Sequence, residues 1–102
     1  MLLTKEYLKK IPKLGETKSV KIENKWLWVK LFTPWSNWTW YIVEMDQVTG
    51  ECFGFIAFPM PIWGYFNIKE LMEIRGSGGM KIKRDRHFVA ITFGDWRVKV
   101  CE

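Results

Sequence analysis

The sequence predicts a small single domain of the α+β class over residues 1–102, with a mainly antiparallel β-sheet, an N-terminal helix and one central helix. Two observations predict it. Apolar residues alternate with other residues between turn signals from position 26 to position 58, which is typical of strands joined by hairpins. Two segments, one at the start and one in the middle, have helical caps and spacing. Consecutive strands with few helices favour an antiparallel sheet.

Length and composition also indicate one domain. A chain of 102 residues suits a single modest core, and the seven tryptophans indicate that this core is packed. The longest uncharged run, residues 52–68, contains two prolines and is too short to span a membrane, and the N-terminus has no signal-peptide pattern. We therefore expect a cytoplasmic protein without a membrane segment. Cys52 and Cys101 match no metal or redox spacing and are expected to be reduced thiols.

The first predicted elements are a short helix and an edge strand. Thr4 can cap the helix, which runs to about Lys10, and Pro12 ends it. The polar stretch 15–24 alternates near its end and is predicted to be an edge strand.

Three central strands follow, at residues 26–33, 38–46 and 51–58, and Gly50 suits the turn between the last two. Alternation in the first strand puts one set of apolar residues on one face: Leu27, Val29 and Leu31. Alternation in the second strand groups another set: Thr39, Tyr41, Val43 and Met45. Both faces of these strands are therefore apolar. Helices are expected to cover one face, and the chain itself, a second protomer in a homo-oligomer, or a partner covers the other.

The central helix is predicted to begin after Asn67, which can accept a backbone N–H, and Glu70 completes a capping-box pattern. Gly76 suits the left-handed position that ends a helix. A short extended piece at 80–84 and a final hairpin, 87–93 with 96–100, complete the predicted fold.

A wider set of residues resembles one known family. The residues that carry the resemblance are Leu3-Thr4-Lys5-Glu6, Val29-Lys30-Leu31-Phe32-Thr33-Pro34, Thr39-Trp40-Tyr41, Glu44, Asp46, Gly64-Tyr65-Phe66, Glu70-Leu71, Ile74-Arg75-Gly76, Gly79-Met80, Ile82 and Arg84-Asp85. This pattern resembles the bacterial and phage family catalogued as domain of unknown function 2958. Ile62-Trp63, Lys83 and the tail after Gly94 depart from it. The resemblance implies a small soluble domain, often encoded on mobile elements, and implies no activity.

Residues suited to catalysis are scarce. His87 is the single histidine, and the glycines at 76–79 follow a helix rather than a strand, which is the wrong context for a phosphate-binding loop. Glu44 and Asp46 share a strand face and could hold Mg²⁺ or Mn²⁺, or could instead be exposed carboxylates that pair with Lys or Arg. We expect no cofactor and no enzymatic activity, and a metal-dependent enzyme is the least favoured hypothesis.

Two binding functions remain. The favoured one is a protein-binding accessory module of a mobile genetic element that modulates a host or defence protein, with Trp35, Trp63 and Arg75 as exposed anchors, since Trp and Arg dominate interface energies. The alternative is nucleic-acid binding by a basic cluster together with Trp26 and Trp28. The cluster comprises Lys81, Lys83, Arg84 and Arg86, with Arg75 nearby. A solvated strand with ion pairs explains the same charges equally well.

Overall fold

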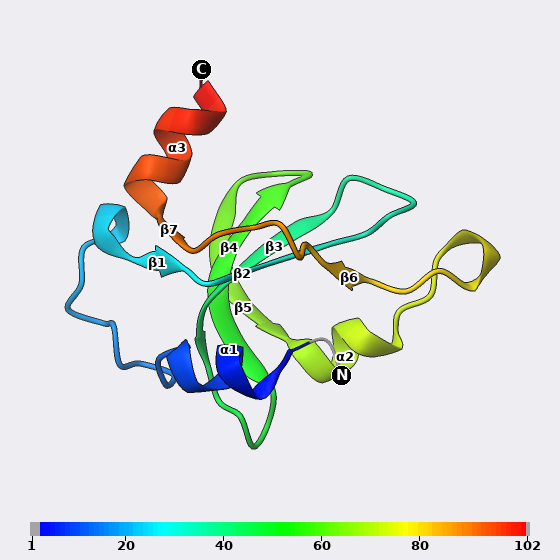
Figure 1. The fold of residues 1–102 in the computed structure, drawn as a ribbon, viewed down its shortest axis with the longest axis horizontal. Helices are drawn as coiled ribbons and strands as arrows, with labels where there is room; N and C mark the ends of the chain where they lie inside the picture. The colour runs from blue at the N-terminus through cyan, green and yellow to red at the C-terminus, as the bar shows by residue number, and fades with distance from the viewer. Residues whose placement is uncertain (1–2, 102) are drawn as a thin grey trace.

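The computed structural model describes residues 3–101, which form one mixed fold around an antiparallel sheet (Figure 1). In chain order the elements are α1 (Lys5–Lys10), the 3₁₀ turn η1 (Ile22–Asn24), β1 (Trp26–Leu27), β2 (Val29–Phe32), β3 (Thr39–Met45), β4 (Glu51–Phe58), β5 (Ile62–Asn67), α2 (Ile68–Glu73), η2 (Ser77–Gly79), β6 (Lys83–Arg84), β7 (Ile91–Thr92) and α3 (Phe93–Cys101). None of the helices within 3–101 is long and apolar enough to cross a membrane.

The main sheet has the strand order β5-β4-β3-β2-β6, and each neighbouring pair is antiparallel. The short strands β1 and β7 pair separately. The predicted α+β class with a mainly antiparallel sheet is therefore confirmed. The C-terminal helix α3 was not predicted.

The predicted final hairpin is wrong, because residues 93–101 form α3. Helical spacing places Phe93 and Trp96 on the same side, with ring centroids 5.7 Å apart, and both rings pack on Phe55. The predicted hairpin, 87–93 with 96–100, would also have placed Phe93 and Trp96 opposite one another on one face. The spacing of these two residues in the sequence therefore did not distinguish the hairpin from the helix, in which both rings pack on Phe55.

The predicted edge strand at 15–24 is also wrong, since these residues form turns and η1. The backbone N–H groups of Gly15 and Thr17 donate to the carboxylate of Glu44, at 2.7 and 2.9 Å, instead of pairing with a strand. A side chain of β3 thus satisfies the backbone that a ladder would otherwise satisfy.

Helix α2 begins as predicted and ends differently. The side chain of Asn67 accepts hydrogen bonds from the N–H groups of Lys69 and Glu70, so the N-cap is confirmed. Gly76 has φ −100°, so the prediction of a left-handed end is wrong. A Cβ atom at Gly76 would lie 2.0 Å from the Trp35 ring, so glycine is needed there for close packing.

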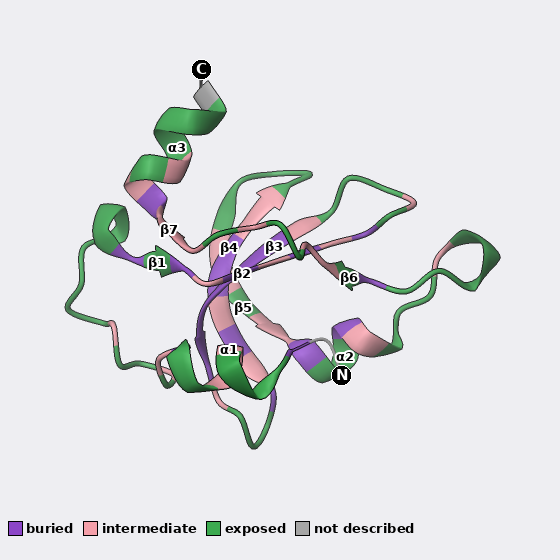
Figure 2. Ribbon diagram, viewed as in Figure 1, coloured by how far each residue is buried: buried purple, intermediate pink, exposed green. Residues whose placement is uncertain are grey.

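Two buried clusters lie on the two faces of the sheet, and buried residues are concentrated in its central strands (Figure 2). The α1/α2 core comprises Leu3, Ile11, Val29, Leu31, Trp40, Ile42, Met45, Cys52, Ile68, Leu71 and Ile82. The α3 core comprises Leu27, Tyr41, Val43, Phe55 and Phe93, with Trp63 and Trp96 packed at its margin. The second face is therefore covered, over part of its area, by the chain's own C-terminal segment.

Two residues lie on the face opposite to the predicted one. Leu27 joins the α3 core while Val29 joins the other, because the ladder breaks between β1 and β2. Met45 lies in the α1/α2 core, apart from Tyr41 and Val43, because the β3–β4 register shifts between Ile42 and Glu44. A bulge of this kind interrupts the strict alternation of side chains.

Cys52 is buried in the α1/α2 core, and it is a free thiol. Burial is the main cause that raises its pKa to about 12, with a further contribution from the charge of Glu51. The thiol is therefore protonated at neutral pH and is a poor nucleophile or metal ligand. The side chain of Cys101 lies outside the described residues.

Candidate functional site

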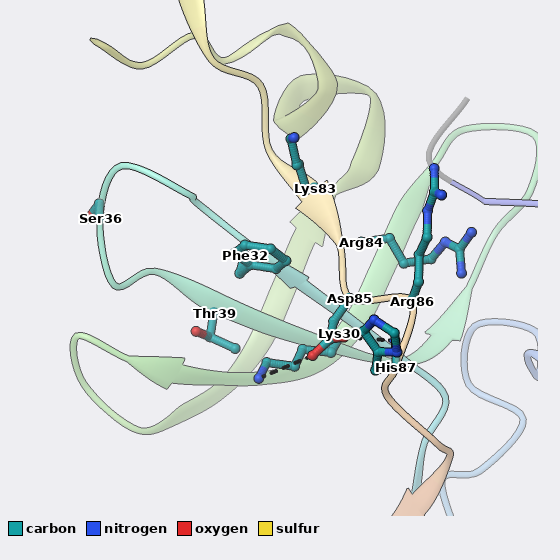
Figure 3. A pocket seen from close by; sticks show the side chains of 9 residues that line it. All are labelled: Lys30, Phe32, Ser36, Thr39, Lys83, Arg84, Asp85, Arg86 and His87. Atoms are coloured by element: carbon teal, nitrogen blue, oxygen red, sulfur yellow. Dashed lines mark hydrogen bonds and ion pairs between the residues drawn. The ribbon is translucent and has the colours of Figure 1, made fainter.

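A cavity of about 690 Å³ lies along the β6 edge of the sheet and is rich in cationic side chains. Its lining comprises Lys30, Phe32, Ser36, Thr39, Lys83, Arg84, Asp85, Arg86 and His87 (Figure 3). Four Lys and Arg residues face one carboxylate in this lining, which gives the cavity an excess of three positive charges without counting His87. We call this cavity the β6 cavity.

The strand register puts one half of the β6 cavity on a single face of the sheet. Phe32 is paired with Thr39 on one side and with Lys83 on the other. Directly opposed residues of antiparallel strands project to the same face. Lys30 lies two residues before Phe32 and therefore shares this face. An aromatic ring, a hydroxyl and two ammonium groups thus meet on one surface.

The arginines of the β6 cavity project to the other face. Arg84 is paired with the core residue Leu31, and its guanidinium lies 4.7 Å from the centroid of the Tyr7 ring of α1. This cation–π contact holds the Arg84 side chain against the helix. The side chain of Arg86 runs beside it, away from Phe32 (Figure 3). The positive charge therefore wraps around the edge of the sheet from one face to the other.

Asp85 organises the segment that follows β6. Its carboxylate lies 3.6 Å from the Lys30 ammonium and accepts a hydrogen bond from the backbone N–H of His87 at 2.9 Å. Its own N–H donates to the Lys30 carbonyl. These contacts fix the backbone that carries Arg86 and His87, and they offset one of the four cations.

The predicted basic cluster is divided by the structure. Lys83, Arg84 and Arg86 line the β6 cavity, but Arg75 and Lys81 do not. The backbones of Arg75 and Lys81 form an isolated antiparallel bridge across the η2 turn. The Arg75 guanidinium donates to the carbonyls of Met72 and Ile74, at 2.7 and 3.1 Å. Arg75 thus satisfies carbonyl groups at the end of α2, which is a structural role.

The tryptophans predicted to be exposed anchors are half-buried. Trp35 packs against the α1/α2 core and over Gly76. Trp63 lies in β5, with its ring centroid 5.3 Å from that of Phe55 and 5.1 Å from that of Phe93. Neighbouring prolines and turns suggested that Trp35 and Trp63 are exposed, but both rings pack against other side chains of the domain. Trp26 and Trp38 are the more exposed rings, at 46% and 43%.

The two candidate metal ligands serve local hydrogen bonds. Glu44 is buried and accepts from both N–H groups described above and from the Thr17 hydroxyl. Burial raises its pKa, but the hydrogen bonds from Thr17 and Gly15 and the charge of Lys25 outweigh burial, so the pKa lies below its usual value. Asp46 accepts from the N–H groups of the following turn. Within residues 3–101, no group of three His, Cys, Asp or Glu could hold a metal ion.

Of the nine residues that line the cavity, the sequence-based site prediction included Lys83, Arg84 and Arg86. It missed the four residues between positions 30 and 39: Lys30, Phe32, Ser36 and Thr39. The alternation that puts Lys30 and Phe32 on one face was visible in the sequence. Their approach to Lys83 was not, because β2 and β6 are separated by about fifty residues and pair over only two positions. Long-range pairing of such a short strand leaves no local signal.

Comparison with known proteins identifies the family of the chain. A family model described as "Protein of unknown function (DUF2958)" matches residues 2–96. The searches of curated proteins and of solved structures found no match.

Proposed function

The chain belongs to this DUF2958 family of unknown function, and we propose that it binds nucleic acid through the β6 cavity. The observation that carries the proposal is the excess of positive charge around Lys83, Arg84 and Arg86, with hydroxyl groups in the same lining. Phosphate backbones are bound by clusters of Lys and Arg together with Ser and Thr hydroxyls. The net charge of +5 for the whole chain would speed its encounter with such a polyanion.

This proposal is tested by measuring how tightly the chain binds fluorescently labelled DNA and RNA at several salt concentrations. Lys83→Glu/Arg86→Glu is expected to lower affinity at least tenfold and to reduce the salt slope by between one and two, because each lost phosphate contact removes about 0.7–0.9 from it. The matched control is Lys18→Glu/Lys21→Glu, which makes the same charge change at two exposed lysines outside the cavity.

The control should keep most of the affinity and the salt slope of the wild-type protein. An equal loss in both double variants would mean that net charge alone drives binding, and it would overturn the assignment to the β6 cavity. Unchanged affinity in Lys83→Glu/Arg86→Glu would overturn it as well.

A second function, protein binding, is favoured by the opposite edge of the sheet. In the described sheet, β5 pairs with β4 on one side and has no strand on the other. The six residues of β5 include neither a charge nor a proline, and Ile62 and Tyr65 are 57% and 67% exposed. We propose that a protein partner adds an extended strand here, as in β-augmentation. Such a role suits an accessory module of a mobile element that engages a host protein.

Affinity capture with three forms of the chain tests this second function. Ile62→Lys/Tyr65→Lys puts charge on the β5 edge, and Val48→Lys is the control at a site that is 83% exposed in the β3–β4 turn. A protein retained by the wild-type chain and by the control, and lost with the β5 variant, would support a partner at β5. A protein retained equally by all three would contradict it.

A further inference from the structure

Phe32 is placed differently from the other aromatic residues on its face of the sheet. Tyr41 and Phe55 lie on this face and are covered by α3, with the Trp96 ring 5.4 Å and 5.2 Å from their respective centroids. Phe32 lies further along the same face, in the lining of the β6 cavity, and is half-buried. The C-terminal helix therefore covers one end of an aromatic face and leaves the other end as the floor of a cavity.

The surroundings of Phe32 are polar and cationic. Its two cross-strand partners are Thr39 and Lys83, and Figure 3 shows the Phe32 ring between these side chains. Lys30 projects from the same face and is held near Asp85. An aromatic ring that served only to fill the core would be enclosed by apolar side chains, as Phe55 is. Phe32 instead has an apolar surface with ammonium groups within the same lining.

From this placement we infer that the ligand of the β6 cavity is a single-stranded nucleic acid, with a nucleobase stacked on Phe32. The inference rests on the proposed function. Single-strand binders combine aromatic rings, on which bases stack, with a positive groove that follows the phosphates. Here the Phe32 ring supplies the stacking surface, and Lys83 and Arg86 lie on either side of β6, where they can contact phosphates. The Thr39 hydroxyl donates to the Asn37 carbonyl, so it can accept a hydrogen bond from a sugar hydroxyl or a base amino group.

A duplex does not match this arrangement. Proteins that read duplex DNA insert a protruding helix or β-ribbon into a groove. Phe32 lies in a strand of the sheet, is half-buried and lines the β6 cavity, so a base must leave its own stack to reach the ring. The cavity volume of about 690 Å³ also lies within the range of small-ligand sites. A cavity of this size can hold parts of a few nucleotides but not a double helix.

Titration of the full chain with oligonucleotides of equal length, about 12 nucleotides and thus within the site sizes of single-strand binders, tests the inference. The probes are single-stranded DNA, single-stranded RNA and the corresponding DNA duplex. We expect at least one single strand to bind at least tenfold more tightly than the duplex. Preference for either single strand supports the inference, and the DNA and RNA arms decide which of the two fits better.

Substitution of Phe32 separates stacking from charge. Phe32→Leu is expected to lower single-strand affinity about tenfold and to leave the salt slope unchanged, because stacking loses no phosphate contact. Phe32→Trp should retain the affinity, so it keeps the test valid if the Leu variant folds poorly. The control is Tyr65→Leu, an exposed aromatic residue on the opposite edge, which should bind as the wild-type chain does.

The outcomes separate failure of the proposed nucleic-acid binding from failure of the single-strand inference. If no oligonucleotide binds at low salt, the proposed function itself fails, and the inference fails with it. The inference is overturned, while the nucleic-acid proposal stands, if the duplex binds as tightly as both single strands. The same conclusion follows if Phe32→Leu binds as tightly as the wild-type chain, or if Phe32→Trp loses as much affinity as Phe32→Leu.

Discussion

The two edges of the same sheet are built in opposite ways. The β6 edge pairs over two residues, and β6 and the two residues that follow it are all charged: Lys83, Arg84, Asp85 and Arg86. The β5 edge is six residues long and carries no charge. Sheet edges are usually protected from unwanted pairing by shortness, charge, proline or bulges. The β6 edge therefore has two of these protections, shortness and charge, and the β5 edge has neither of them.

This difference helps to interpret the charges at β6. A two-residue strand offers few free backbone groups to an incoming chain, so its shortness already limits pairing. The chain also tolerates a longer edge without any charge. Edge protection therefore requires less positive charge than the β6 cavity contains, and this surplus is what favours a ligand there. At β5 the same reasoning favours a strand from a protein partner.

The largest expected effect is on the free energy of unfolding. It distinguishes the centre of the sheet from the β5 edge at a single pair of residues. Gly54 of β4 and Gly64 of β5 are direct partners. A Cβ atom at Gly54 would lie 1.9 Å from the Tyr41 carbonyl oxygen, whereas one at Gly64 would meet nothing within 4 Å. Gly54→Ala should therefore lower the free energy of unfolding by about 3 kcal/mol. Urea denaturation of both variants measures this.

Gly64→Ala is the matched control for that experiment. Its backbone φ is not positive, so alanine fits without strain and should change the free energy of unfolding by less than about 1 kcal/mol, in the stabilising direction. Equal destabilisation by the two substitutions would contradict the open β5 edge and weaken the proposal of a partner strand there.

The second prediction compares a buried charge with the solvated charges at the edges. Glu44→Gln should lower the free energy of unfolding by about 1–3 kcal/mol at pH 7, because the N–H groups of Gly15 and Thr17 lose a charged acceptor. Its pKa is lowered in the folded chain, so its stabilisation is present above the unfolded pKa and is lost as pH falls through the folded pKa. The Gln variant should therefore lose less stability on acidification than the wild-type chain.

Glu16→Gln is the control for this prediction, since Glu16 is an exposed acid between Gly15 and Thr17, the two residues whose N–H groups Glu44 binds. Its unfolding free energy should stay within about 0.5 kcal/mol of the wild-type value, as for most surface substitutions. Thermal or urea unfolding between pH 3 and pH 7 gives both profiles. A Glu44→Gln profile parallel to that of the wild-type chain would contradict the role of this carboxylate.

The sequence was sufficient for elements whose signals are local. Asn67 caps α2 as predicted because its acceptor and the N–H groups that it binds lie within three residues. The β3–β4 hairpin followed from the alternation on both sides of Gly50. The segment 93–101 was misjudged because its conformation is set by distant partners, namely Phe55 and Tyr41. Tertiary packing overrides local patterns in such short segments.

The candidate site was partly predictable for the same reason. Lys83, Arg84 and Arg86 were visible as a dense run of charge. The aromatic and hydroxyl half of the cavity depends on the pairing of β2 with β6 and on which part of the sheet α3 covers. Trp35 and Trp63 illustrate the converse, since their neighbours suggested exposure while Gly76 and Phe93 provide packing for their rings.

The smallest expected effect on stability concerns the charges of the β6 edge. Lys83→Gln/Arg86→Gln should change the free energy of unfolding by less than about 0.5 kcal/mol, because Lys83 and Arg86 are both exposed. Oligonucleotide affinity should nevertheless fall, because two phosphate contacts are lost. The molar mass by light scattering should stay that of the wild-type chain, because the shortness of β6 still limits pairing. An increased mass with unchanged oligonucleotide affinity would show that these charges protect the edge, and the two edges would then differ in their protection and not in their ligands.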